Sequence, residues 1–180
     1  MEESKTRSIQ ENVARLLEQG IQFDKKKEYA NAAAAYKAAL KMDPDNILLT
    51  FKLGWSEYKA GSVNSGLVKM KKAIEEGVDD ADSLGKLGEV LMREGPEQDL
   101  DHAERLLKES VDKDPEVPET LVWLGRVCEK KGNMEEARGL YQRAVECPNC
   151  TMVDAFFYLG VICEKQKDYK KAILHLKTCL

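Results

Sequence analysis

A glycine recurs at a nearly constant interval along this chain, and this period constrains the fold more than any other feature. The glycines are Gly20, Gly54, Gly88, Gly125 and Gly160, at successive steps of 34, 34, 37 and 35 residues. A small residue recurs behind them with a similar period, at Ala32, Gly66, Ala103, Ala137 and Ala172. Such a period predicts a row of similar units that contact mainly their neighbours, so the length of 180 residues is no guide to domain number.

The fourth unit shows what each copy contains. Its first apolar stripe has the i, i+3, i+4, i+7 spacing of a helix and consists of Leu121, Leu124, Gly125 and Cys128. Its second stripe follows a break at Gly132 and consists of Ala137, Tyr141 and Ala144. Large side chains beside a glycine, facing a small–aromatic–small stripe, predict a closely packed antiparallel helix pair. No segment shows the alternation of a β-strand, so the five copies predict ten helices and an all-α fold.

Capping and breaking residues predict the boundaries. Residues 1–8 are expected to be a flexible N-terminus and residues 9–180 a continuous array, with repeats near 13–46, 47–80, 81–117, 118–151 and 153–180. Ser8 with Glu11 has the pattern of a capping box for the first helix, and Asp45 is expected to cap the third. Gly77 is expected to close the fourth helix. Pro96 is expected in the first position of a helix, after a turn lengthened by three residues.

The pattern resembles the tetratricopeptide (TPR) repeat family over roughly residues 9–180. The family's usual Trp early in the first helix is replaced in each repeat, by Leu16, Thr50, Leu84, Leu121 and Phe156. The resemblance implies a right-handed superhelical solenoid of antiparallel helix pairs, in which the first helix of each pair lines a concave groove. It also implies a scaffold, adaptor or co-chaperone that binds other proteins, and it implies no catalysis.

The groove residues expected from this resemblance lie on the helical stripe beside each Leu–Gly pair. They are Leu17, Ile21, Phe51, Lys52, Trp55, Tyr58, Lys86, Glu89, Trp123, Arg126, Phe157 and Tyr158. An exposed strip this rich in aromatic residues is the kind of surface that anchors a partner peptide or helix. The alternative is that the aromatics pack between adjacent first helices, which stays open for Trp123 and Phe157. For Trp55 the groove position is favoured.

One subfamily can be compared position by position. Co-chaperones of the heat-shock chaperones hold a partner's C-terminal carboxylates with Lys and Asn on the first groove helix, Asn on the second, and Lys and Arg on the third. The matching positions here are Leu17, Ile21, Lys52, Asp82 and Lys86. Two basic residues are present, no Asn is, and Asp82 has the wrong sign for a carboxylate. The sequence therefore predicts against a chaperone-tail clamp.

Composition and charge limit the other function classes. The chain is 43% hydrophobic and 33% charged, which is a composition that folds. Its net charge of −4 argues against a nucleic-acid or anionic-membrane partner. No apolar run is long enough to span a bilayer and no signal core is present, so the expected location is cytoplasmic, with a nuclear or ciliary one left open. Two alternative functions remain: an RNA-binding helical repeat, or the targeting segment of a larger enzyme.

Residues with the chemistry of catalysis or metal binding are few. Cys147 and Cys150 have metal or redox spacing, but structural zinc requires four ligands, and His102 and His175 are not spaced to supply them. The five cysteines, an odd number confined to the last third of the chain, fit a reducing compartment. No phosphate-binding glycine loop or nucleophile–base pattern occurs. The sequence predicts no enzyme, no cofactor and no metal, and it predicts a loop with incidental thiols at Cys147.

The last helix is expected to carry an apolar face. Its stripe consists of Ala172, Ile173, Leu176 and Cys179, followed by Leu180. Arrays of this kind usually end in a polar capping helix, because the outer face of the last repeat is otherwise apolar. We therefore expect either that the natural chain continues beyond Leu180 or that this end docks on another subunit or on a second copy of the chain.

Overall fold

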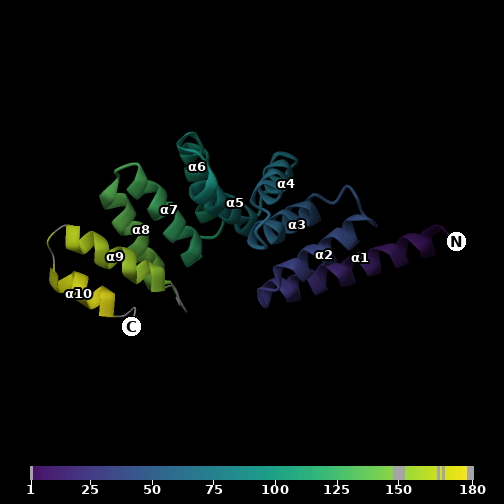
Figure 1. Ribbon diagram of the computed structural model, residues 1–180, viewed down its shortest axis with the longest axis horizontal. Coiled ribbons are helices and arrows are strands. Elements are labelled where there is room, and N and C mark those ends of the chain that lie inside the picture. Colours follow the sequence, from purple (N-terminus) through teal and green to yellow (C-terminus); the bar gives the residue numbers. More distant parts are fainter. Residues whose placement is uncertain (1, 148–152, 166, 168, 178–180) are drawn as a thin grey trace. The chain divides into compact units, whose positions relative to one another are not determined.

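A computed structural model describes residues 2–147, 153–165, 167 and 169–177. These residues form ten α-helices and one 3-10 turn, and no strand occurs among them (Figure 1). The helices divide into two compact units, Met1–Asp79 and Asp80–Leu180. The prediction of an all-α fold of ten helices is confirmed.

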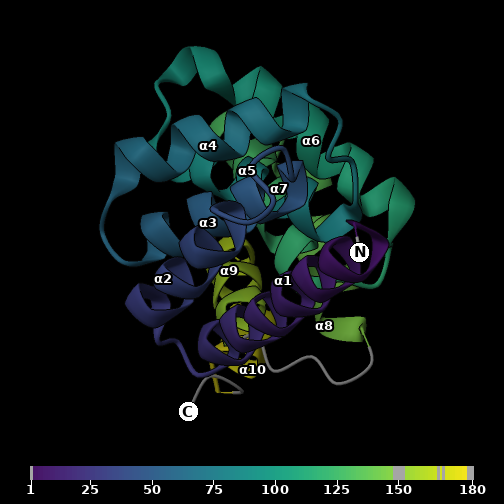
Figure 2. The same ribbon diagram turned by 90° about the vertical axis from the view of Figure 1, so that its right-hand side faces the viewer.

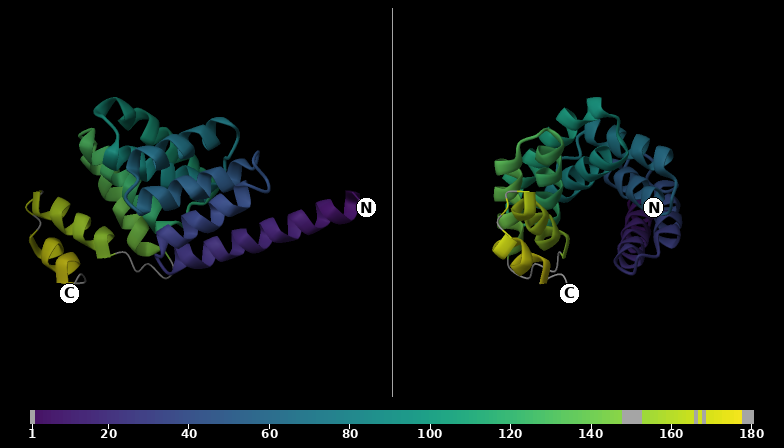
Figure 3. Two further views of the ribbon diagram at one scale, coloured as in Figure 1. Left: turned by 45° about the vertical axis from the view of Figure 1, so that its right-hand side comes forward. Right: turned by 60° about the vertical axis from the view of Figure 1, so that its left-hand side comes forward.

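Unit 1 contains two helix pairs. Its helices are α1 (Glu2–Lys25), α2 (Tyr29–Leu40), α3 (Ile47–Lys59) and α4 (Val63–Glu75). The first packs on the second, the second on the third and the third on the fourth. Helix α1 has 24 residues and α2 has 12, so the N-terminal half of α1 extends beyond its partner, as Figure 2 and the left panel of Figure 3 show.

Unit 2 contains three helix pairs. Its helices are α5 (Ala81–Glu94), α6 (Leu100–Lys113), α7 (Pro118–Lys130), α8 (Met134–Glu146), α9 (Val153–Lys165) and α10 (Tyr169–Lys177), and the 3-10 turn η1 spans Glu97–Asp99. The pairs are α5 with α6, α7 with α8, and α9 with α10. The first helices also touch one another, because α7 contacts both α5 and α9. One continuous face of unit 2 is therefore built from the first helices of three successive pairs.

The repeated glycine marks the closest point between the two helices of a pair. A β-carbon at Gly125 would lie 2.5 Å from Cε1 of Tyr141, and one at Gly88 would lie 2.5 Å from Cγ of Leu107. Real β-carbons essentially never come so close to another heavy atom. The glycine leaves room for a large side chain of the second helix to lie against the backbone of the first, which confirms the predicted packing.

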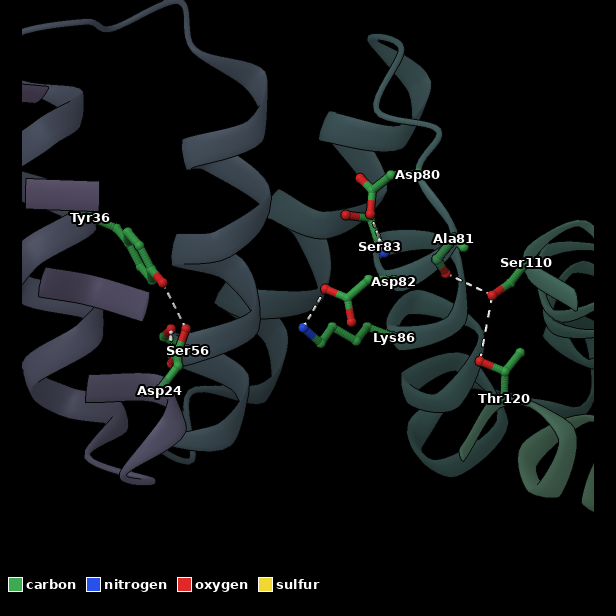
Figure 4. Close-up of polar contacts among 10 residues, drawn as sticks. All are labelled: Asp24, Tyr36, Ser56, Asp80, Ala81, Asp82, Ser83, Lys86, Ser110 and Thr120. Carbon is green, nitrogen blue, oxygen red and sulfur yellow. Dashed lines mark hydrogen bonds and ion pairs between the residues drawn. The ribbon is translucent and has the colours of Figure 1, made fainter. Parts of the chain in front are cut away.

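A hydroxyl–carboxylate contact accompanies this packing in the first repeat. Tyr36 Oη donates to Asp24 Oδ2 at 2.8 Å, and Ser56 Oγ donates to Asp24 Oδ1 at 2.8 Å, so one carboxylate joins α1, α2 and α3 (Figure 4). Burial and this hydrogen bond raise the pKa of Tyr36 well above its usual range. In the fourth repeat Tyr141 Oη donates to Glu129 at 3.1 Å. Both carboxylates lie four residues after the repeated glycine, so the contact is a recurring part of the fold.

Three predicted helix starts differ from the structure. Helix α1 begins at Glu2, so Ser8 lies inside the helix, where Arg7 pairs with Glu11 at 3.2 Å. The cap of α3 is Asn46, whose Oδ1 accepts from the Leu49 N–H at 3.0 Å, and not Asp45. Pro96 precedes the turn η1 and does not begin α6.

Much of the core lies on the predicted stripes, and one stripe residue is exposed. The stripes of the third and fourth repeats are buried throughout, and Gly77 ends α4 with a φ of 116°, as a C-terminal cap requires. Ile173 was expected to face inward, but its side chain is 55% exposed. Its helix, α10, packs mainly against α9 among the described elements. Leu176, Cys179 and Leu180 have no described side chains.

Gly125 and Gly139 provide a matched test of the helix packing. We expect Gly125→Leu to unfold the fourth repeat and to cost at least about 3 kcal/mol of unfolding free energy, because the Tyr141 ring occupies the space. Gly139→Ala on α8 is the control: its β-carbon meets nothing within 4 Å, so the variant should gain up to about 1 kcal/mol from helix propensity. Chemical denaturation followed by circular dichroism measures both. Similar stabilities for Gly125→Leu and the unaltered chain would refute the proposed pairing.

Candidate protein-binding surface

The predicted groove residues of unit 1 all lie on α1 and α3. Leu17 and Ile21 on α1, and Lys52 and Trp55 on α3, are partly buried. The Trp55 ring is 5.9 Å from the Tyr58 ring, and Lys59 Nζ lies 5.1 Å above the Trp55 centroid. Trp55 is therefore partly buried, and Tyr58 and Lys59 of its own helix lie against one side of its ring.

Two of the predicted groove residues of unit 1 are buried, although the sequence predicts them to be exposed. Phe51 is 2% exposed and Tyr58 is 7% exposed, so neither offers a partner much surface. A helical wheel assumes one packing partner for each helix, whereas α3 packs against both α2 and α4. More of the circumference of α3 is covered than the wheel predicts.

In unit 2, arginine and aromatic side chains interleave across the first-helix face. The Arg126 guanidinium carbon lies 4.8 Å from the Trp123 ring centroid, and that of Arg93, on α5, lies 5.7 Å from the same centroid. Arg126 also lies over the Tyr158 ring of α9, at 5.3 Å. A cation over an aromatic face is attracted by the ring quadrupole, so these contacts tie α5, α7 and α9 together.

Tyr158 is fixed in turn by the packing beneath it. Its ring stacks on Tyr141 at 5.2 Å with an interplanar angle of 20°, and the edge of Phe157 meets it at 5.5 Å. Phe157 itself is 47% exposed. We call the set of Arg93, Trp123, Arg126, Phe157 and Tyr158 the arginine–aromatic surface. Two interpretations were left open for Trp123 and Phe157, namely packing between adjacent first helices or exposure in the groove. Trp123 contacts one arginine of its own helix and one of a neighbouring helix, while Phe157 is largely exposed.

A pocket of about 250 Å³ adjoins Arg126. It is lined by Met92, Arg126, Glu129, Lys130, Met134 and Tyr158. Lys130 Nζ donates to the Met92 carbonyl at 3.2 Å, near the C-terminal end of α5. The pocket combines two cations, one carboxylate and two thioethers, and all of these belong to unit 2.

The remaining predicted residues of this face are paired within α5. Lys86 Nζ donates to Asp82 Oδ2 at 2.6 Å (Figure 4), and Arg93 pairs with Glu89 at 3.2 Å. The lysine that the chaperone-tail clamp would require is thus already paired with a carboxylate of the protein itself. This pairing agrees with the prediction against that clamp.

The second-helix side of unit 2 carries a self-neutralised charge network. Lys131 Nζ pairs with Asp101 at 2.7 Å and also contacts Glu104, and Lys108 pairs with Glu104 at 2.6 Å and with Glu136 at 3.7 Å. Hydrogen bonds from Lys108 and Lys131 hold the pKa of Glu104 below its usual range. Cations and carboxylates are matched here, whereas the contacts described above for Arg126 on the arginine–aromatic surface are with aromatic rings.

Arg93 was not among the predicted residues, although the sequence contains a signal for it. A basic residue stands five positions after the repeated glycine in every repeat: Lys25, Lys59, Arg93, Lys130 and Lys165. A cation in the last turn of a helix is favoured by the helix dipole. The same register brings Lys59 over Trp55 in unit 1 and Arg93 over Trp123 in unit 2.

The structure brings no metal-ligand set together in the part of the chain that it describes. Cys147 Sγ contacts the Arg143 carbonyl at 3.4 Å, while Cys150 and the side chain of His175 lie outside the described residues. His102 is half-buried on α6. No described helix is both long enough and apolar enough to cross a bilayer.

The fold and its repeated glycine contact define an all-α helical-repeat solenoid. A family model described as tetratricopeptide repeat matches residues 17–65 and 97–149, which is more than half of the chain. The chain belongs to the tetratricopeptide repeat family. Its fold is that of protein-interaction scaffolds.

Solved structures of other repeat proteins share this fold. A crystal structure of MamA is 21% identical, with 89% of this chain and 91% of that chain covered and a TM-score of 0.69. YrrB, described as a TPR protein with an unusual peptide-binding site, is 21% identical over 97% of this chain and 89% of that one, with a TM-score of 0.69. A thermophilic TPR protein of Thermus thermophilus, TTC0263, is 18% identical over 93% and 90%, with a TM-score of 0.71. No curated protein sequence matches this chain significantly.

Cys128 should be inert in the folded protein. Burial raises the pKa of its thiol to about 11, and nearby Glu136 adds to the effect. The thiolate is the reactive form, so iodoacetamide at pH 8 should modify Cys128 only after denaturation, whereas the half-buried Cys147 should react in the native state. Peptide mass spectrometry of the alkylated protein measures this difference. Equal native rates at the two positions would contradict it.

Proposed function

We propose that this chain is a scaffold or adaptor that holds a peptide or helix of a partner protein along the first helices of its repeats, within a larger assembly. The observation that carries the proposal is the arginine–aromatic surface of unit 2. It is continuous over α5, α7 and α9, and it presents ring faces and guanidinium groups that the core does not use completely.

The composition of this surface supports a protein partner. Trp, Tyr and Arg are the residues most enriched where protein–protein binding energy concentrates, and stacking restrains their side chains before the partner arrives. Phe157 is 47% exposed beside the stacked Tyr158 and would lose that exposure on binding. The peptide-binding site in the description of YrrB makes a peptide a reasonable form for the ligand.

Trp123→Ala and Trp55→Ala test the two units separately. Each is expected to weaken partner binding by more than about 1 kcal/mol with little loss of helicity, as removal of an anchor does. The measurement is a pull-down from lysate with quantitative mass spectrometry, then titration of the partner that it identifies. Arg105→Ala, an exposed change on α6, is the control. Unchanged affinity with a much lower melting temperature would show that the tryptophans are core residues.

The same surface could stack nucleic-acid bases, so an RNA partner is an outcome to be tested. The net charge of −4 disfavours it. An electrophoretic shift with single-stranded oligonucleotides separates the two classes. A shift abolished by Trp123→Ala would replace the proposal with RNA binding. If the pull-down instead recovers a catalytic domain covalently continuous with this chain, the result would favour the alternative that the chain is the targeting segment of a larger enzyme.

A second copy of the chain is a further proposed partner, through α10. Ile173 is 55% exposed and Leu174 is 65% exposed, and burying apolar surface gains roughly 25 cal/mol per Å². Light scattering at rising concentration should show a mass above that of the monomer, and Ile173→Lys should restore the monomer. Val68→Lys, at an equally exposed apolar residue on α4, is the control. A monomer at every concentration would end this proposal.

A further inference from the structure

We propose that a second copy of this chain docks on the second-helix side of unit 2, with Leu174 of each copy inserted into the pocket beside Gly139 of the other. The inference rests on the proposed self-association through α10, and it names the surface that receives that helix. The arginine–aromatic surface lies on α5, α7 and α9, so a dimer of this kind leaves it available to a different protein.

The first argument is a glycine that contacts within the chain do not explain. Among the glycines whose surroundings the structure describes, every other one has a positive φ or would bring a β-carbon within 3 Å of another residue. Gly139 has neither feature: it is exposed inside α8, and a β-carbon there meets nothing within 4 Å. A glycine inside an exposed helix is less stable than an alanine, and the close approach of another molecule is one reason for its presence.

The second argument is the pocket that this glycine borders. It has a volume of about 350 Å³, it lies between α8, α9 and α10, and its buried lining includes Leu159 and Cys163. One repeat earlier, Lys108 pairs with Glu104 and Glu136 across the corresponding place between α6, α7 and α8. The equivalent positions at the pocket hold Gln142, Arg138 and Lys171. A lysine between two glutamates therefore cannot close this pocket, and an aliphatic side chain can enter it.

The third argument is an exposed leucine in the same register. The position two residues after the repeated small residue is exposed in all five repeats, at Ala34, Val68, Arg105, Gly139 and Leu174. The first four are exposed although further helices follow them, so the 65% exposure of Leu174 follows from the register alone. Helix α10 thus presents a large apolar side chain where α8 presents a pocket. Such a face is self-complementary, as a two-fold dimer requires.

The fourth argument is charge complementarity. Helix α10 contains three lysines and no acidic residue, so its charge is +3, whereas α8 contains three glutamates and two arginines, so its charge is −1. Lys170 and Lys177 flank the leucine at i−4 and i+3, and Glu136 and Glu146 flank the glycine at i−3 and i+7. Contact between two copies of α10 would oppose like charges, whereas α10 on α8 opposes unlike charges. The surface that receives α10 is therefore α8 of the second copy.

Charge reversal tests the pairing of α10 with α8. One variant carries Lys170→Glu and Lys177→Glu, and the other carries Glu136→Lys and Glu146→Lys; all four side chains are exposed. In sedimentation velocity the unaltered chain should approach the dimer mass as its concentration rises, and each variant alone should dimerise about tenfold more weakly or worse. An equimolar mixture should recover the dimer, because both contacts of the mixed dimer then join opposite charges. A mixture that stays monomeric would overturn the inference.

Substitutions at the pocket test the insertion itself. Gly139→Leu should fill the pocket from within its own chain and weaken the dimer about tenfold or more. Its melting temperature should not fall, because the added side chain begins in open space. Leu174→Ser should weaken the dimer to a similar extent, and Val68→Ser, at the same register in unit 1, is the matched control and should change nothing. Dimerisation of Gly139→Leu as strong as that of the unaltered chain would contradict the insertion.

The failures of the inference and of the proposed function are distinguishable. If Ile173→Lys removes the dimer but Gly139→Leu and the charge-reversed variants keep it, self-association through α10 holds and α8 is not the receiving surface. If the unaltered chain is a monomer at every concentration, self-association and this inference both fail, while the scaffold function is decided separately by Trp123→Ala. Loss of a different protein from the pull-down with Gly139→Leu, without any dimer, would assign the pocket to that protein instead.

Discussion

The close contact at the repeated glycine is the constraint on which the rest of the structure depends. In the fourth repeat, the absence of a side chain at Gly125 lets the Tyr141 ring lie against the backbone of α7. The buried ring then donates its hydroxyl to Glu129 on the same helix. Gly20 and Tyr36 repeat the arrangement in unit 1, with Asp24 as the acceptor. Sterics and one buried hydrogen bond thus fix the distance and register of each of these pairs.

The arginine–aromatic surface is a consequence of that contact. Tyr141 supports Tyr158 by stacking at 5.2 Å, and Tyr158 together with Trp123 supports Arg126. A sequence of contacts therefore runs from the core position Gly125 to a side chain that a ligand can reach. The second-helix side of unit 2 has no such support, and its lysines are held by carboxylates instead. This physical difference between the two sides is the reason for proposing the first-helix face, and not the second-helix side, as the binding surface.

Periodicity predicted the fold because the glycine and its large neighbour are both fixed by sterics, which a sequence displays directly. It predicted Trp123, Arg126 and Tyr158 on the first helices for the same reason. It failed for Phe51 and Tyr58, because burial on a helix with two packing partners depends on tertiary contacts that one helical wheel omits. The stacking around Arg126 could not be predicted from the sequence either, because it depends on side-chain rotamers across three helices. The start of α1 at Glu2 was missed because helix-forming residues extended the helix past the apparent cap at Ser8.

A photo-crosslinking comparison tests the central claim most directly. A benzophenone amino acid placed at Phe157, which is 47% exposed on α9, samples the first-helix face, and the same amino acid at the exposed Arg105 on α6 samples the second-helix side. Irradiation with the natural partners present should give discrete crosslinked species at position 157 and none at position 105. Crosslinks at position 105 alone, or of equal yield at both positions, would contradict the claim that the first-helix face of unit 2 holds the partner.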